Sequence, residues 1–446
     1  MDKSRMGMIA WYPFKKNATI LEINPSGEHI TKEILGIKSY AIITPDALAN
    51  KKYDNIFLVD PGNEINYYNM LKIKKALSSR GRLLIAFENP LGLRYWCGEP
   101  SPITGNIFDS ITGMDAQKSR VDFENLLSQL GFLQKWYYLL PDHWNCREVF
   151  SDGILPDASL NARFSTYDKT LGQKLLYERA LYPQIIRNKA FPFFANAYFV
   201  ECRLQGLSCD VGYAALTAYR SKGHRNATIV NTNKSKVVKK PIDIESVQCL
   251  NIIVANHIEL NKRGIKTIPF CVKNNQGVMP FVNNKTLLAY WIQQFEEIDF
   301  NIDEITKKLD KLYFNTILRS SDILPAGTAG NHVALGAIMK KAYLELIPSN
   351  CFYNPNNNEY TFFDQEFVMD NAPASIIIYR AINDIFSPMS PLCKYDIDGQ
   401  VKKILFKRYG LHDIIHLLHA FESAFFNNIF DVIPNLAYRV RERSLR

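Results

Sequence analysis

The sequence predicts an α/β domain with a doubly wound parallel sheet, followed by an α+β domain. Two observations support this fold class. Strand-like apolar runs alternate with helical patterns over residues 1–150, as in parallel sheets whose strands are connected by helices. From residue 197 onward the strand-like runs come first and long helical patterns follow, which is typical of an α+β domain.

Five apolar runs of the first part have the length and composition of β-strands. They are ATILEI (18–23), SYAIIT (39–44), NIFLVD (55–60), RLLIAFE (82–88) and LQKWYYLLP (133–141). Helical patterns lie between them, at 65–77 and 121–131. Only ten residues, 45–54, separate the second and third runs, whereas a helix–strand–helix passage needs roughly two to three times as many. We therefore expect the sheet to lack one strand together with its helices.

The composition limits the class of protein. The 446 residues are 47% hydrophobic, enough for two domains with separate cores. The net charge of +9 is modest, and we interpret the basic clusters 72–82 and 439–446 as solvated helix faces, with no nucleic-acid partner. Eight cysteines without a C-x-x-C pair predict reduced thiols in a cytoplasmic protein. Because no apolar run could span a membrane, we expect at most peripheral association with its inner face.

The expected domain boundaries follow from the change of pattern. The stretch 171–194 reads as a helix that ends before Pro192, because the residue before a proline disfavours helical backbone. We therefore expect a first α/β domain over 1–150, a linker with a helix over 151–196, and a second domain over 197–446.

The turn after the first strand is the expected place for a cofactor, because ligands of such sheets bind beyond the carboxyl ends of the strands. Glu22 and the turn 24–28 would line this site. Cofactor loops use several glycines so that the backbone can approach phosphate or ribose closely. Gly27 is the only glycine in this turn, and Thr44 stands where an acidic residue would hold ribose hydroxyls. The sequence thus predicts a retained fold with an eroded cofactor site.

A longer motif carries a family resemblance. The run WYPFKKNATILEINPSGEHIT and the pattern E-N-x-x-G-L-x-Y-x-x-G-x-P…G-x-x-F-D-x-I-x-G (88–113) resemble a bacterial family of class I methyltransferases encoded with surface-polysaccharide genes. The resemblance implies a Rossmann-like methyltransferase sheet. In that family the turn resembles E-I-G-x-G-x-G, whereas Asn24, Ser26 and Glu28 stand here in place of the glycines. We therefore expect no tight binding of S-adenosylmethionine (SAM) and a structural or protein-docking role for this domain.

A second motif lies in YLELIPSNCFYNPNNNEYTFFDQEF (343–367). Phosphotransferases with a kinase-like fold need an acid that orients the acceptor hydroxyl. They also need an asparagine five residues later, and an aspartate at the end of the next strand, to hold magnesium against ATP. Glu345, Asn350 and Asp364 have this order and spacing. The sequence therefore predicts a protein-kinase-like domain that uses ATP and Mg²⁺.

A lysine upstream completes the predicted nucleotide site. In KVVKKPI (236–242), Lys239 or Lys240 stands where a kinase-like domain grips the ATP phosphates, and Glu245 is the expected partner of that lysine. Two features depart from the pattern: Glu345 replaces an aspartate, and no G-x-G-x-x-G covers the phosphates. A solvated strand end for the lysines, and an ordinary loop with a strand-end carboxylate for the acids, remain alternatives.

The family named above includes tandem proteins in which a kinase follows the methyltransferase and modifies the end of an O-antigen glycan. The segments 362–370 and 376–382 resemble those that follow the metal-binding acid in these proteins. The resemblance implies a glycan or lipid-linked sugar as phosphate acceptor and a glycosyltransferase as partner. The alternative is a catalytically inactive scaffold whose two pseudoenzyme domains organise a glycosyltransferase complex.

Three histidines share one face of the helical pattern 411–422. His412, His416 and His419 recur at i, i+4 and i+7, a spacing that can bind zinc together with an acidic neighbour. The apolar residues on the opposite face favour the simpler interpretation, in which the histidines form the polar side of an amphipathic helix.

Overall fold

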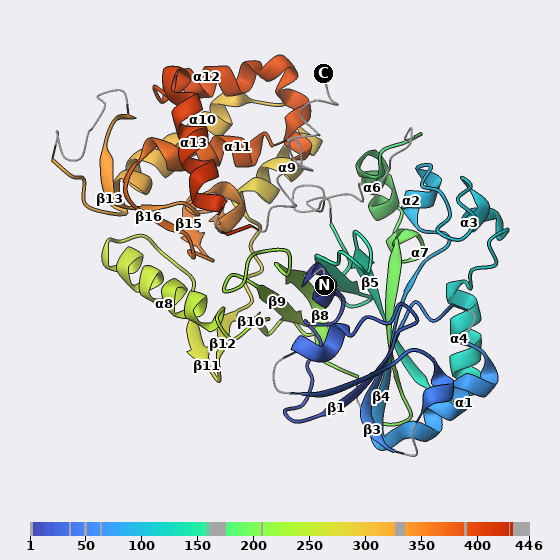
Figure 1. The fold of residues 1–446 in the computed structure, drawn as a ribbon. Helices are drawn as coiled ribbons and strands as arrows, with labels where there is room; N and C mark the ends of the chain where they lie inside the picture. Colours follow the sequence, from blue (N-terminus) through green and yellow to red (C-terminus); the bar gives the residue numbers. More distant parts are fainter. Residues whose placement is uncertain are drawn as a thin grey trace. The chain divides into compact units, whose positions relative to one another are not determined.

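The computed structural model describes residues 3–34, 37–48, 51–62, 65–157, 160, 175–206, 208–325, 335–387, 390–427 and 429–430. The chain forms two compact units, of which the first comprises residues 1–157 and 164–246 and the second residues 158–163 and 247–446 (Figure 1). The basic cluster 439–446 lies outside the described residues.

The first unit contains one large sheet with short and medium helices at its sides. Its strands are β1 (Thr19–Ile23), β2 (Lys38–Ile42), β3 (Tyr53–Val59), β4 (Leu77–Glu88), β5 (Leu133–Leu140), β6 (Glu148–Ser151), β7 (Ala197–Arg203), β8 (Val211–Leu216), β9 (Asn226–Asn231) and β10 (Lys236–Pro241). Its helices are α1 (Tyr67–Ala76), α2 (Leu93–Trp96), α3 (Asp109–Thr112), α4 (Arg120–Gln129), α6 (Glu178–Arg187) and α7 (Phe191–Phe194). All five strands and both helices predicted for the first part of the chain are therefore present.

The strand order of this unit is β10-β9-β8-β6-β5-β7-β4-β3-β1-β2. Strands β2, β1, β3 and β4 pair in parallel. Strand β7 lies antiparallel between β4 and β5, and β6, β8, β9 and β10 continue the sheet in antiparallel pairs. The connection from β2 to β3 forms only the short 3₁₀ helix 45–47 in its described part. Both strands flank β1, and the described residues between them form no further strand or α-helix, in agreement with the short spacing in the sequence.

The central strands are buried on both faces, as near-continuous apolar runs require. In β4 the residues Leu83 to Phe87 are all buried. Helices α1 and α4 lie beside this part of the sheet (Figure 1), and Ser119 and Asp122 form a capping box that fixes the start of α4. Residues before β1 also enter the core of this unit, where Trp11 packs against Phe199 of β7 with ring centroids 5.0 Å apart.

The boundary between the units differs from the prediction. The sequence pattern places β7 to β10 in a separate domain that begins at 197, but they belong to the sheet of the first unit, and the long segment of the second unit begins at Val247. The predicted linker helix 171–194 is divided between α6 and α7 in its described part. Local pattern identifies a strand, but it does not show that β4 and β7, more than a hundred residues apart, will pair.

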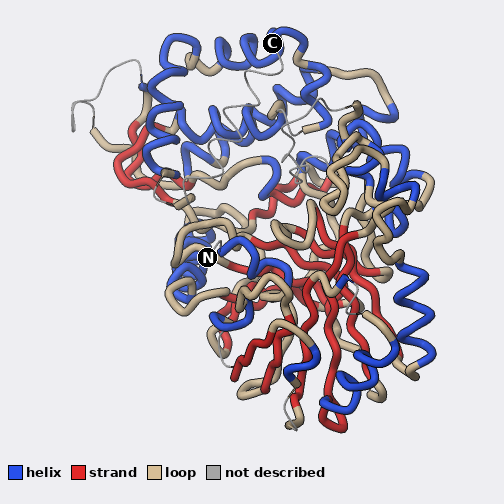
Figure 2. The backbone as a smooth tube through the Cα atoms, turned by 45° about the vertical axis from the view of Figure 1, so that its right-hand side comes forward, coloured by secondary structure: helices blue, strands red, loops and turns tan. Residues whose placement is uncertain are grey.

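The second unit is largely helical (Figure 2). Its helices are α8 (Val247–Lys262), α9 (Leu287–Glu297), α10 (Ile302–Asn315), α11 (Ser375–Ile385), α12 (Gln400–Arg408) and α13 (Ile415–Phe426). Its strands are β11 (Cys271–Lys273), β12 (Gln276–Pro280), β13 (Ile338–Tyr343), β14 (Cys351–Asn354), β15 (Glu359–Phe362) and β16 (Val368–Pro373). The long helices pack on one core, in which Trp291, Leu309, Tyr343 and Ile378 are completely buried.

The strands of this unit pair in antiparallel hairpins. Strand β11 pairs with β12, β14 pairs with β15, and β13 pairs with β16. The β14–β15 hairpin thus lies, in sequence, inside the β13–β16 pair. One connecting segment, 344–350, leads from β13 to β14, and the other, 363–367, leads from β15 to β16. This topology brings the two segments to the same place.

Candidate functional site

The turn after β1 is tight although it holds a single glycine. The side-chain oxygen Oδ1 of Asn24 accepts hydrogen bonds from Ser26 N (3.1 Å) and Ser26 Oγ (2.8 Å), which makes an Asx turn. Gly27 supplies the one left-handed residue, with φ of +75°, and donates its amide to Asn24 O. The turn therefore closes by means of an asparagine side chain rather than by further glycines.

Glu22 is fully buried and its carboxylate has local partners. Oε1 accepts Ile30 N (3.0 Å), and Oε2 accepts both Thr31 N and Thr31 Oγ1 (2.8 Å each). These bonds satisfy the start of the 3₁₀ helix 30–33. The carboxylate thus connects β1 to the segment that follows the turn.

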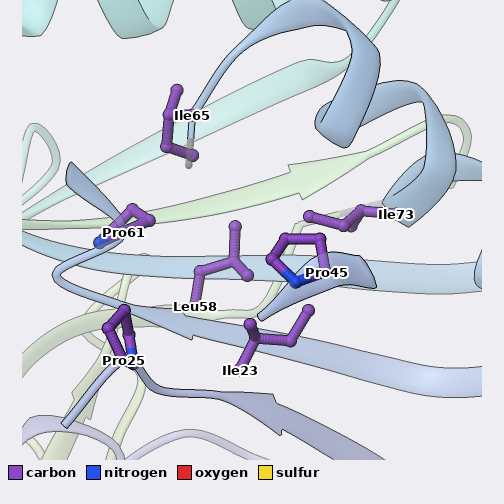
Figure 3. A pocket seen from close by; sticks show the side chains of 7 residues that line it. All are labelled: Ile23, Pro25, Pro45, Leu58, Pro61, Ile65 and Ile73. Atoms are coloured by element: carbon purple, nitrogen blue, oxygen red, sulfur yellow. The ribbon is translucent and has the colours of Figure 1, made fainter. Parts of the chain in front are cut away.

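A small hollow lies at the carboxyl ends of β1, β2 and β3 (Figure 3). Its free volume is only about 10 Å³, room for about one water molecule. Its walls are apolar, formed by Ile23, Pro25, Pro45, Leu58, Pro61, Ile65 and Ile73. The predicted cofactor edge of the sheet therefore carries a small apolar hollow, which as it stands is too small to enclose a nucleoside base.

Three titratable side chains gather farther along the same edge, and the sequence did not single them out. His143 follows β5, and its Nε2 lies 2.7 Å from Oδ2 of Asp60, the residue after β3. Burial opposes a charge on this histidine, but Asp60 and Glu88 outweigh it and raise the pKa of His143 above its usual value. Its other nitrogen, Nδ1, has no hydrogen-bond partner among the described residues.

Glu88 is the last residue of β4, and its carboxylate is bound by two residues that follow it in the sequence. Its Oε2 lies 2.6 Å from Nη2 of Arg94 and 2.7 Å from the hydroxyl of Tyr95. Burial acts to raise the pKa of Glu88, but Arg94 and His143 outweigh it, so the pKa is lowered. The motif 88–113 thus contributes an ion pair that holds α2 against the end of β4.

The structure distinguishes the two lysines of β10. The ammonium of Lys240 donates to Ala10 O (2.8 Å) and Tyr12 O (3.1 Å), and burial lowers its pKa to about 8. Successive side chains of a strand point to opposite faces, so Lys239, which is 3% exposed, points away from this contact. Glu245 pairs with Lys222 at 2.5 Å. Lys239 is therefore the lysine of this pair that remains a candidate for phosphate binding.

In the second unit, the two connecting segments are joined by backbone hydrogen bonds at both ends. Leu344 N donates to Phe367 O (3.0 Å), and Phe363 N donates to Asn350 O (3.1 Å). Asn350 therefore lies directly beside the residue that precedes Asp364. The structure thus brings together the two residues that the sequence predicts as magnesium ligands, and both are partly exposed.

Two side chains of helix α11 bind the backbone of the segment 344–350. Arg380 Nε donates to Leu344 O (2.9 Å), and Asp384, one turn later on the same helix, accepts Ser349 N at 2.8 Å. Burial raises the pKa of Asp384 to about 6, although its bond to Ser349 acts in the opposite direction. Both ends of the segment 344–350 are thus fixed to one helix. The only trace of this contact in the sequence is the spacing of Arg380 and Asp384, four residues apart.

Glu345 has a different set of partners from the one that its predicted role implies. Its Oε2 accepts Glu366 N (2.6 Å) and Phe367 N (3.0 Å), and the side chain is 7% exposed. Its carbonyl oxygen accepts Nε2 of Gln365 at 2.8 Å. The residue therefore contacts the segment that follows Asp364 through both its side chain and its backbone.

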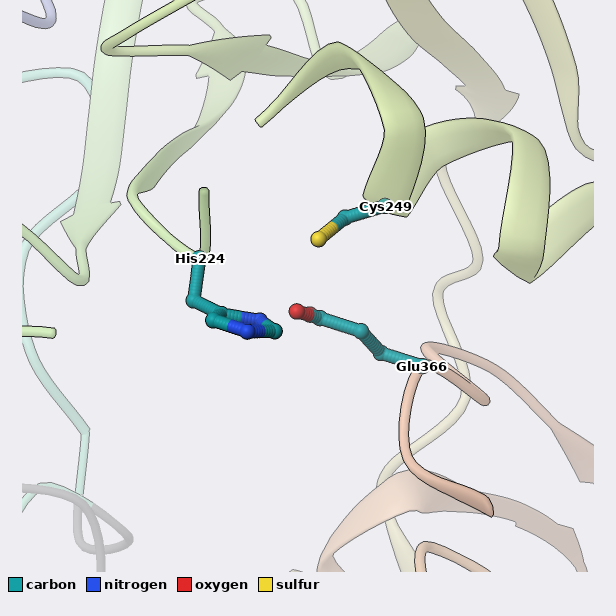
Figure 4. A group of neighbouring side chains, drawn as sticks. All are labelled: His224, Cys249 and Glu366. Carbon is teal, nitrogen blue, oxygen red and sulfur yellow. The ribbon is translucent and has the colours of Figure 1, made fainter. Parts of the chain in front are cut away.

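Cys249 of α8 and Glu366 lie close together within the second unit. Their sulfur and carboxylate oxygen are within 4.8 Å of each other and both side chains are buried (Figure 4). Figure 4 also draws His224, which belongs to the first unit. Two ligands do not make a metal site, because zinc is normally held by at least three protein side chains.

The histidine-bearing helix has the amphipathic pattern described above. His412, His416 and His419 are exposed, whereas Ile414 and Leu418 are buried against the core. Among the described residues these histidines do not gather with other possible ligands around a common point.

The comparisons with known proteins concern the fold. No family model matches the chain, and no curated protein matches it. Solved structures similar to it are SAM-dependent methyltransferases. They include the plantazolicin methyltransferase BpumL in complex with S-adenosylhomocysteine (SAH), at 14% identity over 46% of this chain and 83% of that chain with a TM-score of 0.25. A possible histamine N-methyltransferase from Thermotoga maritima matches at 12% identity over 46% and 90%, with a TM-score of 0.25.

A methyltransferase from Archaeoglobus fulgidus is similar at 14% identity over 45% of this chain and 92% of that chain, with a TM-score of 0.28. At such identities the likeness is one of fold alone. The chain thus has a mixed α/β fold whose structural neighbours, over about half of its length, are Rossmann-like methyltransferases. No helix in the described part of the chain is both long and apolar enough to cross a membrane.

The prediction that the first unit does not bind SAM tightly is wrong in its reasoning, and methyltransferases with SAH bound are among the solved structures of similar fold. The physical error lies in the argument from glycines. It assumed that a tight turn after β1 needs several of them, whereas Asn24 closes the turn through its side chain and Gly27 alone is left-handed. The number of glycines therefore says little about a ligand at this edge.

Proposed function

We propose that the second unit transfers a phosphoryl group from Mg-ATP to a hydroxyl group. The observation that carries the proposal is the meeting of the segments 344–350 and 363–367, which sets Asn350 beside Asp364. The order β13, loop, β14–β15 hairpin, acidic segment, β16 is also the order that a kinase-like fold requires of its catalytic and metal-binding segments.

The donor atoms suit the metal. Magnesium prefers oxygen ligands and keeps several of its waters, so that one carboxylate and one amide oxygen from the protein are sufficient. Asp364 would supply the carboxylate and Asn350 the amide oxygen. When bound, Mg²⁺ neutralises the negative charge that the phosphates carry during transfer.

The backbone at Asp364 also favours a functional role. Its φ of +55° lies in the left-handed region, which aspartate adopts more readily than most residues with a side chain. This conformation sets the direction of the Asp364 side chain at the place where the metal would bind.

The acceptor and the partner belong to the same proposal, and they rest on the sequence resemblance. The acceptor would be a sugar hydroxyl of a surface glycan or of a lipid-linked sugar. A glycosyltransferase would be the partner, at the inner face of the membrane. The rival is a second unit without activity that organises such a complex.

Thermal unfolding with and without Mg-ATP tests the proposal. At a hundred times its dissociation constant, a ligand stabilises the native state by about 2.7 kcal/mol, which for a unit of this size raises the melting temperature by several degrees. We expect this shift in the wild type and in Asp370→Asn, an exposed carboxylate on β16, but not in Asp364→Ala. Transfer of labelled phosphate to a glycan extract then tests the reaction. Absence of a shift in the wild type would leave the inactive scaffold as the better account.

A second candidate function belongs to the first unit, where we propose that the carboxyl edge of the parallel strands β1, β2 and β3 binds SAM. The hollow supports this by its position at the carboxyl ends of β1, β2 and β3, where ligands of such sheets bind. Calorimetric titration with SAH tests it. Pro25→Trp, at the exposed mouth, should abolish the heat of binding, while Ile103→Trp, at an exposed position 64% accessible to solvent, should leave it unchanged.

A further inference from the structure

The carboxylate of Glu345 binds the backbone that follows the proposed metal ligand. Two successive amides, Glu366 N and Phe367 N, donate to the same oxygen, Oε2, at 2.6 and 3.0 Å. Hydrogen bonds from amides to an ionised acceptor are stronger than those between neutral groups, and more so in a buried place. The bonds therefore fix Glu366 and Phe367, which lie two and three residues after Asp364.

Two further side chains hold the same stretch of backbone. Gln365 is fully buried, and its Nε2 donates to Glu345 O and Phe363 O, both at 2.8 Å. From α8, Asn256 Nδ2 donates to Gln365 O at 2.8 Å. We call Glu345, Gln365 and Asn256 the clamp. Together they bind the backbone at residues 363, 365, 366 and 367, on both sides of Asp364.

The clamp holds the backbone on both sides of Asp364. It therefore keeps the left-handed conformation of this residue, and with it the direction of its side chain, in place. Here Phe363 is held through its amide and its carbonyl, and Glu366 and Phe367 through their amides. Glu366 N also donates to Asp364 O at 2.9 Å, which closes a tight turn centred on Gln365, directly after the aspartate.

The clamp also accounts for glutamate at position 345, where the kinase-like pattern has aspartate. A glutamate carboxylate lies one methylene farther from the backbone than that of an aspartate. This extra length is a disadvantage for a group that must meet an acceptor hydroxyl at hydrogen-bond distance. It is what allows Oε2 to reach the amides of Glu366 and Phe367 from the neighbouring segment.

We propose that Glu345 is a positioning residue, which fixes the segment 363–367 so that Asp364 faces the metal, and that it does not take the proton of the acceptor. The proposal rests on the phosphotransferase function proposed above. Phosphoryl transfer depends mainly on positioning and on electrostatic stabilisation, so an enzyme of this kind can act without a strong base at this position.

Glu345→Gln and Glu345→Asp separate the two roles, because each preserves what the other removes. Glutamine keeps the length and an oxygen that accepts both amides, but it cannot take a proton. Aspartate keeps the carboxylate, but it is too short to reach the amides. For a positioning residue we expect Glu345→Gln to retain the rate and the Mg²⁺ dependence within about threefold. Glu345→Asp should need at least about tenfold more Mg²⁺ for half-maximal binding of ATP.

The opposite order would overturn the proposal. General base catalysis contributes about 100-fold or more, so a proton-accepting Glu345 predicts that Glu345→Gln loses at least this much in rate while its Mg-ATP binding is unchanged. Glu345→Asp would then be the more active variant. Asn256→Ala, which removes another member of the clamp but no carboxylate, should resemble Glu345→Asp in its Mg²⁺ requirement.

Hydrogen exchange keeps this test separate from the test of the proposed function. The amides of Glu366 and Phe367 should exchange slowly in the wild type and in Glu345→Gln, and at least about tenfold faster in Glu345→Asp. This readout needs no ATP. If the wild type neither binds Mg-ATP nor transfers phosphate, the proposed function fails, while slow exchange still supports the clamp. Equal exchange in all three proteins would refute the clamp itself.

Discussion

Asp384 should destabilise the second unit at neutral pH although it makes a hydrogen bond. Burial raises the pKa of this carboxyl from its usual 3.8 to about 6. The folded state therefore binds a proton more tightly than the unfolded state does, and stability falls as the pH rises from about 4 through about 6. Asp384→Asn keeps an oxygen that can accept Ser349 N, and it removes the charge.

The magnitude follows from the displacement of the pKa. One pKa unit corresponds to 1.36 kcal/mol, so a rise of about two units corresponds to roughly 3 kcal/mol at pH 8. Because the side chain is only partly buried, we expect about 1–3 kcal/mol of stabilisation in Asp384→Asn at pH 8. At pH 3.5 the variant and the wild type should be nearly equal, because both side chains are then neutral.

Differential scanning calorimetry between pH 3.5 and 8 measures this difference. For a unit of about 200 residues, 1 kcal/mol corresponds to about 2–4 °C in melting temperature, so the variant should melt several degrees higher at pH 8. Asp370→Asn, at an exposed position on β16, is the matched control and should melt like the wild type. A variant that is less stable than the wild type at pH 8 would show that the charged hydrogen bond to Ser349 outweighs desolvation, and would refute the reasoning.

Three further outcomes concern the first unit. The pKa of His143 is raised in the folded state, so protonated His143 stabilises the first unit, and this stabilisation is lost as the pH rises above about 6.5. His143→Gln should abolish this loss of stability. Denaturant unfolding at pH 6 and 8 measures the difference. Burial lowers the pKa of Lys240 to about 8, so the free energy of unfolding of the wild type should increase by up to about 3 kcal/mol between pH 8 and 10.5. Lys240→Met should abolish this increase. Gly27→Ala should lower the stability by about 1 kcal/mol because φ is +75°, and Gly27→Asn by less; equal losses would show that the left-handed backbone is not the cause.

The elements of the first unit could be predicted from the sequence because each is local. A few neighbouring residues are sufficient to predict the buried strands β3 and β4 and the capping box that begins α4. The division into units could not be predicted in this way. Strand β7 has a clear strand pattern, but its place between β4 and β5 depends on pairing, along both of its edges, with residues at least 58 positions earlier in the chain. Strand β6 has four residues, too few for a periodic signal.

The candidate site shows the same limit at the level of side chains. The spacing of Asn350 and Asp364 was sufficient to predict that they meet, because a hairpin returns the chain to its starting point. The roles of Glu345 and Lys240 depend on the direction in which each side chain points. Spacing does not reveal that direction, and the structure connects these two residues to backbone groups instead. Asp384 lies outside the motif 343–367, on helix α11, and contacts it through Ser349.

The pH-dependent groups also provide a way to tell the two units apart. The contribution of Asp384, in the second unit, changes between about pH 4 and 6, whereas that of Lys240, in the first unit, changes only above about pH 8. Separate domains commonly unfold in separate transitions. A calorimetric transition that moves to lower temperature between pH 4 and 6 would therefore belong to the second unit, and one that moves to higher temperature above pH 8 to the first. A single transition that responds in both windows would instead show that the two units unfold as one cooperative body.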